Sequence, residues 1–152
     1  MNREPLLAAG TILGIGMGGF VDGILFHQIL QVHNMFSATV PNTSLVNVEV
    51  NMFWDGLFHA FTWLMTALGI FLFWKAGANR SARWSGKEFI GSLLTGWGIF
   101  NLVEGVLDHY VLGIHHVVER LGVSAYDGAF IGSGILFLLA GWTLMRTAVP
   151  VR

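Results

Sequence analysis

Four apolar stretches dominate this sequence, and each is long enough, or nearly long enough, to cross a lipid bilayer. They cover residues 5–30, 53–74, 89–112 and 129–145. A helix needs about 20 apolar residues to span the hydrocarbon core of a membrane. Only 11% of the residues are charged, whereas 54% are hydrophobic. These features predict an all-α integral membrane protein with four helices in a bundle, in contact with the lipid bilayer.

The basic residues predict how these helices are oriented. Seven of the eight lie near the chain ends or between the second and third stretches: Arg3, Lys75, Arg80, Arg83, Lys87, Arg146 and Arg152. Loops rich in lysine and arginine favour the cytoplasmic side of a membrane. We therefore expect the N and C termini to be cytoplasmic and Arg120, the eighth basic residue, to lie outside.

Charge and cysteine content exclude several classes of protein. The formal net charge is −1 and no long basic run occurs, so we expect no nucleic-acid partner. The chain has no cysteine, which excludes disulfides, iron–sulfur clusters and thiolate metal sites. A metal ion bound here would be held by imidazole, carboxylate, thioether or water.

All six histidines fall in one layer under this topology. They lie toward the outer ends of the first three spans: His27, His33, His59, His109, His115 and His116. Carboxylates share the layer: Asp22, Asp55, Glu104, Asp108 and Asp127. Charged groups near hydrocarbon are costly unless they are paired or bind a cation. This layer is therefore the candidate functional region.

The chain also resembles itself. The segment FVDGILFHQILQVHN, from Phe20, aligns without gaps to LVEGVLDHYVLGIHH, from Leu102, with six of fifteen positions identical. The matched polar residues are Asp22 with Glu104, His27 with His109 and His33 with His115. Such matches inside apolar spans predict the duplication of a helix pair.

The second helix of each pair matches more weakly. FWDGLF, around Asp55, resembles AYDGAF, around Asp127, but His59 aligns with Ile131. We expect one membrane domain, residues 1–152, built from tandem repeats at about 5–75 and 88–147. Two spans per repeat imply a pseudo-two-fold axis along the membrane normal. Spans one and three would then face each other, and glycines spaced by four in span one offer a surface for close packing.

Helical spacing narrows the choice of metal ligands. An ideal helix turns about 100° per residue, so Asp22 and His27 should point roughly 140° apart and should not share an ion. Asp55 and His59, four residues apart, share a face. The site we favour takes one imidazole from each of three spans, with a carboxylate beside them: His27, His59 and His109, with Asp108 or Glu104. Asp22 and Asp55 are further candidates, and a hydrogen-bonded packing network is the alternative to a metal site.

A second site could lie nearer the outer water. His33, His115 and His116 are close to the outer loops, as are Met35 and Met52, whose thioethers would favour Cu(I). Asp127 has a simpler explanation, since it follows Ser124 by three residues and can cap a helix.

Two motifs resemble a known family. GFVDGILFHQILQ and FNLVEGVLDHYVLGIHHV are similar to the signature of a bacterial predicted-membrane-protein family known as a domain of unknown function, and the resemblance covers most of the chain. It implies a multi-pass protein of the bacterial inner membrane and an association with haem–copper oxidase assembly, which favours copper. The family usually has a histidine where Asn34 stands here.

Three functional hypotheses follow. The first is a membrane protein that holds a transition metal near the outer face, most simply copper, with zinc or iron as alternatives, and passes it to another membrane protein. The second is a membrane metalloenzyme with Glu104 or Asp108 as the proton-transfer group. The third is a haem protein with His27 and His109 as axial ligands. Catalytic residues and a homo-oligomeric state stay open.

Overall fold

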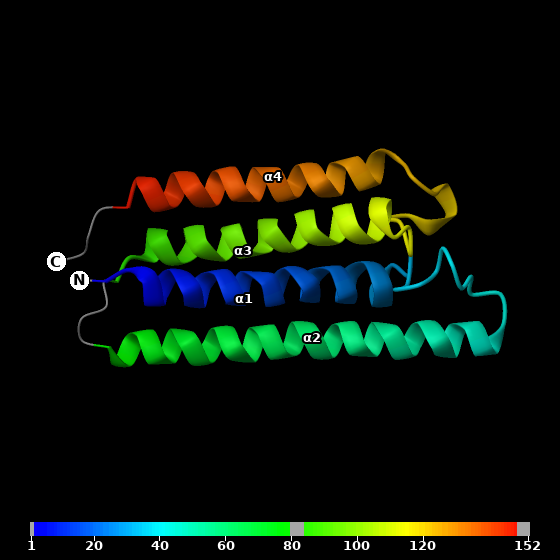
Figure 1. Ribbon diagram of the computed structural model, residues 1–152, viewed down its shortest axis with the longest axis horizontal. Helices are drawn as coiled ribbons and strands as arrows, with labels where there is room; N and C mark the ends of the chain where they lie inside the picture. The colour runs from blue at the N-terminus through cyan, green and yellow to red at the C-terminus, as the bar shows by residue number, and fades with distance from the viewer. Residues whose placement is uncertain (1, 80–83, 149–152) are drawn as a thin grey trace.

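The computed structural model describes residues 2–79 and 84–148, which form four long helices (Figure 1). Their bounds are Glu4–Asp22 for α1, Leu45–Ala78 for α2, Gly86–Val106 for α3 and Ala125–Arg146 for α4. Two π-helical segments, η1 (Gly23–Ile29) and η2 (Leu107–Val111), continue α1 and α3, and a 3₁₀ helix, η3 (Glu119–Leu121), precedes α4. All four segments are long and apolar enough to cross a membrane. The expected all-α membrane fold is confirmed.

Serine residues begin three of the helices. The hydroxyl groups of Ser44, before α2, and Ser85, before α3, each accept a hydrogen bond from the backbone N–H three residues later. Before α4, the Asp127 carboxylate accepts hydrogen bonds from the N–H and the hydroxyl of Ser124. These contacts satisfy backbone groups that the first helical turn leaves without partners. The capping role expected for Asp127 is confirmed.

α2 begins earlier than its apolar pattern predicts. The helix starts at Leu45, not at residue 53, and α4 starts at Ala125, not at residue 129. The extra turns of α2 carry Asn51, whose side chain donates hydrogen bonds to the carbonyl of Val40 and to Oδ1 of Asn42. Polar contacts with the preceding loop hold this part of the helix, so hydropathy alone does not detect it.

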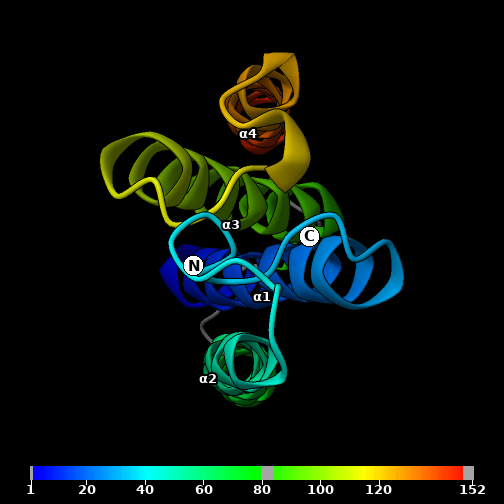
Figure 2. The same ribbon diagram turned by 90° about the vertical axis from the view of Figure 1, so that its right-hand side faces the viewer.

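The four helices form a row when viewed end-on (Figure 2). α1 and α3 pack against each other in the middle, α2 packs on α1, and α4 packs on α3. Large apolar side chains such as Trp63 on α2 and Leu136 on α4 are exposed. These outer faces present apolar surface to the lipid, while the α1–α3 contact forms the interior.

Glycines allow α1 and α3 to approach closely. A Cβ atom on Gly14 would collide with the carbonyl oxygen of Leu93, and a Cβ atom on Gly96 would collide with that of Thr11. Small residues permit such contacts between membrane helices, where packing and not hydrophobic burial drives association. The glycine face of the first span is therefore the surface that contacts α3, as the sequence predicted.

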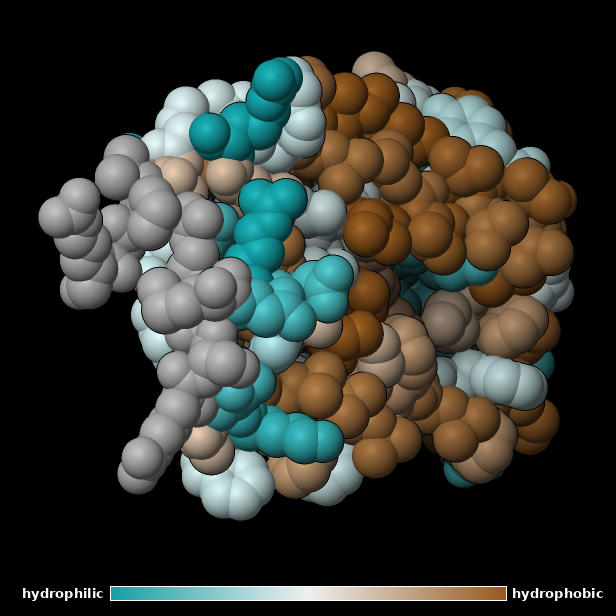
Figure 3. Space-filling model, turned by 60° about the vertical axis from the view of Figure 1, so that its left-hand side comes forward, coloured by the Kyte–Doolittle hydropathy of each residue, from teal (hydrophilic) through white to brown (hydrophobic). Residues whose placement is uncertain are grey.

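The two ends of the molecule differ in character. α1 begins and α4 ends at the same end, where hydrophilic side chains gather, while apolar side chains cover the flanks (Figures 1 and 3). Basic residues at that end include Lys75, at the end of α2, and Arg146, at the end of α4. Arg80, Arg83 and Arg152, which belong to the same topology prediction, lie outside the described residues. The opposite end holds segments 30–44 and 112–124, and we call it the loop end.

Candidate metal centre

α1 and α3 both become π-helical as they reach the loop end. In η1 the Leu30 N–H donates to the Leu25 carbonyl, and in η2 the Leu112 N–H donates to the Leu107 carbonyl. Hydrogen bonds from residue i+5 to residue i widen the helix and bring residues five apart onto nearly the same side. Such segments often occur at functional sites.

The π-helix brings Asp22 and His27 together. His27 Nε2 lies 3.2 Å from Asp22 Oδ2, and both side chains are buried. The sequence-based expectation that these two residues point to different sides was wrong. It assumed an ideal α-helix, whereas the α-helix ends at Asp22 and a π-helix carries His27.

Asp55 fixes the orientation of the His27 ring. His27 Nδ1 lies 2.9 Å from Asp55 Oδ1, and since a carboxylate only accepts hydrogen bonds, Nδ1 carries the proton. The Asp55 carboxylate also accepts hydrogen bonds from the Asn34 side chain and the Met35 N–H. Asp55 therefore orients the His27 ring, whose Nε2 faces the interior 3.2 Å from Asp22 Oδ2.

His33 and His115 are held by reciprocal contacts between two loops. His33 Nδ1 donates to the carbonyl of Val117, and His115 Nδ1 donates to the carbonyl of Met35, each at 3.0 Å. Burial lowers the pKa of His33 to about 4 and that of His115 to about 3. Both rings are therefore neutral near pH 7, with Nε2 as an available electron-pair donor.

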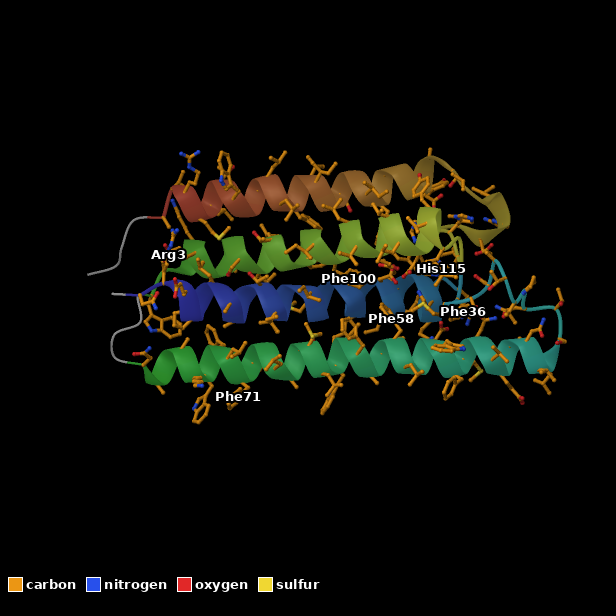
Figure 4. The ribbon with its side chains drawn as sticks, viewed as in Figure 1. Arg3, Phe36, Phe58, Phe71, Phe100 and His115 are labelled. Carbon is orange, nitrogen blue, oxygen red and sulfur yellow. The ribbon has the colours of Figure 1, made fainter. Side chains whose placement is uncertain are left out.

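One buried group brings these donors together. His27, His33, His115 and Glu104 each offer a donor atom, and these four atoms lie within 4.8 Å of one another. Across the described part of the chain, no hydrogen-bond partner was found for the three Nε2 atoms or for Glu104 Oε2. All four side chains are at most 6% exposed. Figure 4 shows His115 at the loop end, where α1 and α3 meet.

The donor set fits a metal ion. Buried polar atoms without partners cost about 1–3 kcal/mol each, and a cation would satisfy several of them at once. Zinc binds imidazole nitrogen at about 2.0–2.1 Å, so no two donors of one ion lie more than about 4.2 Å apart. The donors already lie near that scale, so a buried group that could bind a metal ion is present.

The other predicted ligands lie around this group. His59 Nδ1 is bonded to the Asp55 carbonyl on its own helix, and the ring lies against Gly23 instead of joining the four donors. His109 is buried, with Nδ1 3.1 Å from Asp127 Oδ1 and its ring centroid 5.0 Å from that of His115. Asp108 lines an apolar hollow beside Glu104.

His116 lies one layer further from the donors. Its Nδ1 is 3.6 Å from Asp127 Oδ1, and its backbone N–H donates to Glu119. Asp127 contacts both His109 and His116. In the same way, Asp55 contacts both His27 and Asn34, so His116 corresponds to Asn34. His116 therefore contacts Asp127, the partner of His109, and is not part of the group of four donors.

Contacts in the first half of the chain recur in the second half. His27 contacts Asp55 as His109 contacts Asp127. His33 bonds to the residue two after His115, and His115 bonds to the residue two after His33. These contacts agree with the alignment that predicts duplication, and the duplication itself stays a prediction.

Comparison with known proteins identifies the family. The model of a family described as Predicted membrane protein (DUF2243) matches residues 9–148. The chain belongs to this family. No curated protein and no solved structure matches it. The matched region includes all six histidines of this family member, so the resemblance noted in the sequence motifs is confirmed.

The sequence contained a signal for the residues that the favoured ligand set omitted. The position of His33 and His115 after the apolar spans favours an outer site for them. Yet these two are matched histidines in the aligned segments, whereas His59 aligns with Ile131. A requirement that each ligand have a counterpart in the other half would have favoured His33 and His115 over His59.

Proposed function

We propose that this protein is a membrane-embedded metal-binding protein whose centre lies at the loop end of the α1–α3 pair. The observation that supports it best is the orientation of three imidazoles. In each of His27, His33 and His115, Nδ1 donates to an acceptor, while Nε2 faces the shared interior. A hydrogen bond on the outer nitrogen fixes the tautomer and raises the basicity of a metal-binding imidazole.

A pocket at the loop end offers a route for the ion. It has a volume of about 400 Å³ and is lined by His33 together with polar residues that include Asn34, Ser37 and Glu119. Since His33 also belongs to the donor group, an ion entering this pocket meets a ligand at its inner wall. This geometry suits a protein that takes up and releases a metal from the aqueous phase at this end.

Copper is the ion that we propose first. Nitrogen and oxygen donors generally bind Cu²⁺ most tightly among the first-row divalent metals, and imidazole suits copper, zinc and iron alike. Three imidazoles and one carboxylate form such a set. A role in handing copper to a respiratory oxidase rests on the family resemblance, and we propose the outer face of the bacterial inner membrane as its location.

A second candidate function is that of a membrane metalloenzyme. An apolar hollow beside the donor group favours it. An apolar hollow of about 350 Å³ is lined by Ile15, Phe58 and Phe100 and reaches Glu104 of the donor group. A lipid-soluble molecule, such as a quinone, could enter it from the bilayer and approach the metal. Adding a short-chain quinone to the Cu²⁺-loaded protein should then change the visible spectrum of the metal, and an unchanged spectrum would argue for storage or transfer.

The haem alternative is disfavoured by the same geometry. The His33 ring lies 4.4 Å from that of His27, and the His115 ring lies 5.0 Å from that of His109. These rings occupy the space in which a porphyrin between His27 and His109 would have to lie. We therefore expect no haem absorption from the purified protein.

Metal content of single variants tests the proposal. We expect the purified full chain, expressed with added metal, to contain at least one transition-metal ion per chain. His33→Ala should lower the metal content, whereas His59→Ala should leave it unchanged, because His59 lies outside the donor group. If the native chain carries no metal, or if only His59→Ala removes it, the assignment to His27, His33, His115 and Glu104 fails.

A further inference from the structure

We propose that the centre holds two metal ions in equivalent positions, one between His27 and His33 and the other between His109 and His115. This inference rests on the proposed function, since it concerns the same cluster of residues. It adds the number of metal ions and names His109 as a further ligand. The argument starts from the planes of the four imidazole rings.

The rings of His33 and His115 are stacked. Their planes differ by 8° and their centroids lie 4.7 Å apart. A metal ion binds an imidazole through the Nε2 lone pair, which lies in the plane of the ring. Two parallel, stacked planes share no point at which one ion could bind both rings in plane. A single ion bound to both rings would have to turn one of them out of the stack, whereas two ions can bind with the rings as they stand.

Each stacked ring is crossed most closely by a different third ring, since the alternative pairs, His27 with His115 and His109 with His33, lie farther apart at 5.8 and 6.5 Å. The planes of His27 and His33 meet at 76° with centroids 4.4 Å apart, and those of His109 and His115 meet at 71° with centroids 5.0 Å apart. Crossed planes do share in-plane points, so each crossed pair can bind one ion. The near equality of the two pairs makes the two positions equivalent.

His109 lies beside a carboxylate, as His27 does. It is 1% exposed, and its Nδ1 lies 3.1 Å from Asp127, as His27 Nδ1 lies 2.9 Å from Asp55. Within residues 2–79 and 84–148, neither of its ring nitrogens has a hydrogen-bond partner. His109 can therefore bind a metal ion, although it is not one of the four donors described above.

Two carboxyl groups lie where they could bridge two neighbouring metal ions. Asp22 and Glu104 contact each other, Asp22 lies 3.2 Å from His27, and Glu104 lies 3.4 Å from His115. Two buried carboxylates in contact repel unless a proton or a cation lies between them. Two-metal sites hold their ions about 3.5–4 Å apart, which is shorter than the 4.7 Å between the centroids of the stacked rings.

Metal stoichiometry tests this inference. We would load the full chain with Cu²⁺ and measure copper per chain by elemental analysis. The native chain should bind two ions, His109→Ala and His27→Ala one each, and His59→Ala two. Electron paramagnetic resonance adds a second readout, because two neighbouring Cu²⁺ ions couple and give less signal than two isolated ions. The single ion left in His109→Ala should give a full uncoupled signal.

The outcomes separate the two proposals. One ion per native chain, with an uncoupled signal and no effect of His109→Ala, would overturn the two-ion inference and leave the proposed function standing. No bound ion would overturn both. Since the decisive value is measured on the native chain, a variant that fails to fold does not prevent a conclusion.

Discussion

His33 and His115 come from different loops, yet each donates a hydrogen bond to the backbone of the loop that carries the other, and their rings stack 4.7 Å apart. The two loops are therefore locked together by the same residues that offer donor atoms to the interior. A loss of either histidine should affect both loop packing and metal binding. Variants that alter only the residues around the donors are thus the more informative tests.

Removal of the charge on Asp55 or Asp127 should weaken metal binding without removing a ligand. Each carboxylate contacts Nδ1 of a buried histidine. Replacing such partners lowers metal affinity about 10–100-fold in known sites. We expect Asp55→Asn and Asp127→Asn to show losses of this size in competition titrations with a coloured chelator.

Glu49→Gln is the matched control, because it removes an exposed carboxylate from the same helix as Asp55. Its affinity should equal that of the native chain. Equal losses in Glu49→Gln and Asp55→Asn would mean that the effect is a general one of charge and not of histidine orientation.

Larger residues at the α1–α3 crossing should destabilise the fold. A side chain on Gly14 or Gly96 would collide with the backbone of the facing helix. Overpacking of this kind costs about 1–3 kcal/mol or more, so Gly14→Leu and Gly96→Leu should lower the melting temperature in detergent. Gly132→Leu on α4, where a Cβ atom meets nothing within 4 Å, should leave it nearly unchanged. Equal melting temperatures for the three variants would contradict the close contact between α1 and α3.

Filling the apolar hollow should separate metal binding from access by lipid-soluble molecules. Ile15 lines this hollow, whereas Trp97 lines a smaller hollow of about 170 Å³ that reaches Asp22. Ile15→Trp should fill the larger hollow and abolish any spectral response of bound copper to a short-chain quinone. Metal content should stay at the native value, and a response that survives would show that the quinone reaches the metal by another path.

Reporter fusions test the orientation in the membrane. Alkaline phosphatase fused at Asn42, in the loop end, should be active, because this enzyme needs disulfides that form only outside the cytoplasm. A fusion after Arg146 should behave as cytoplasmic, since basic residues favour that side. The reverse pattern would place the histidine centre at the inner face and remove the link to uptake from outside.

The sequence alone determined the membrane fold and much of the inventory of the centre. The four spans could be recognised because the length of an apolar stretch is a property of the chain itself. Alignment of the two halves also paired His27 with His109 and His33 with His115, and it paired Asp55 with Asp127. These are the residues whose contacts recur in the structure.

The tertiary structure alone decided which donors meet. Asp22 reaches His27 because the helix changes from α to π between them, and a helix with i→i+5 hydrogen bonds turns less per residue than the ideal helix that spacing arguments assume. His33 meets His115 because two loops exchange hydrogen bonds. A local pattern cannot predict this second contact, since it depends on the carbonyls of Val117 and Met35, which only tertiary packing brings within reach of the two rings.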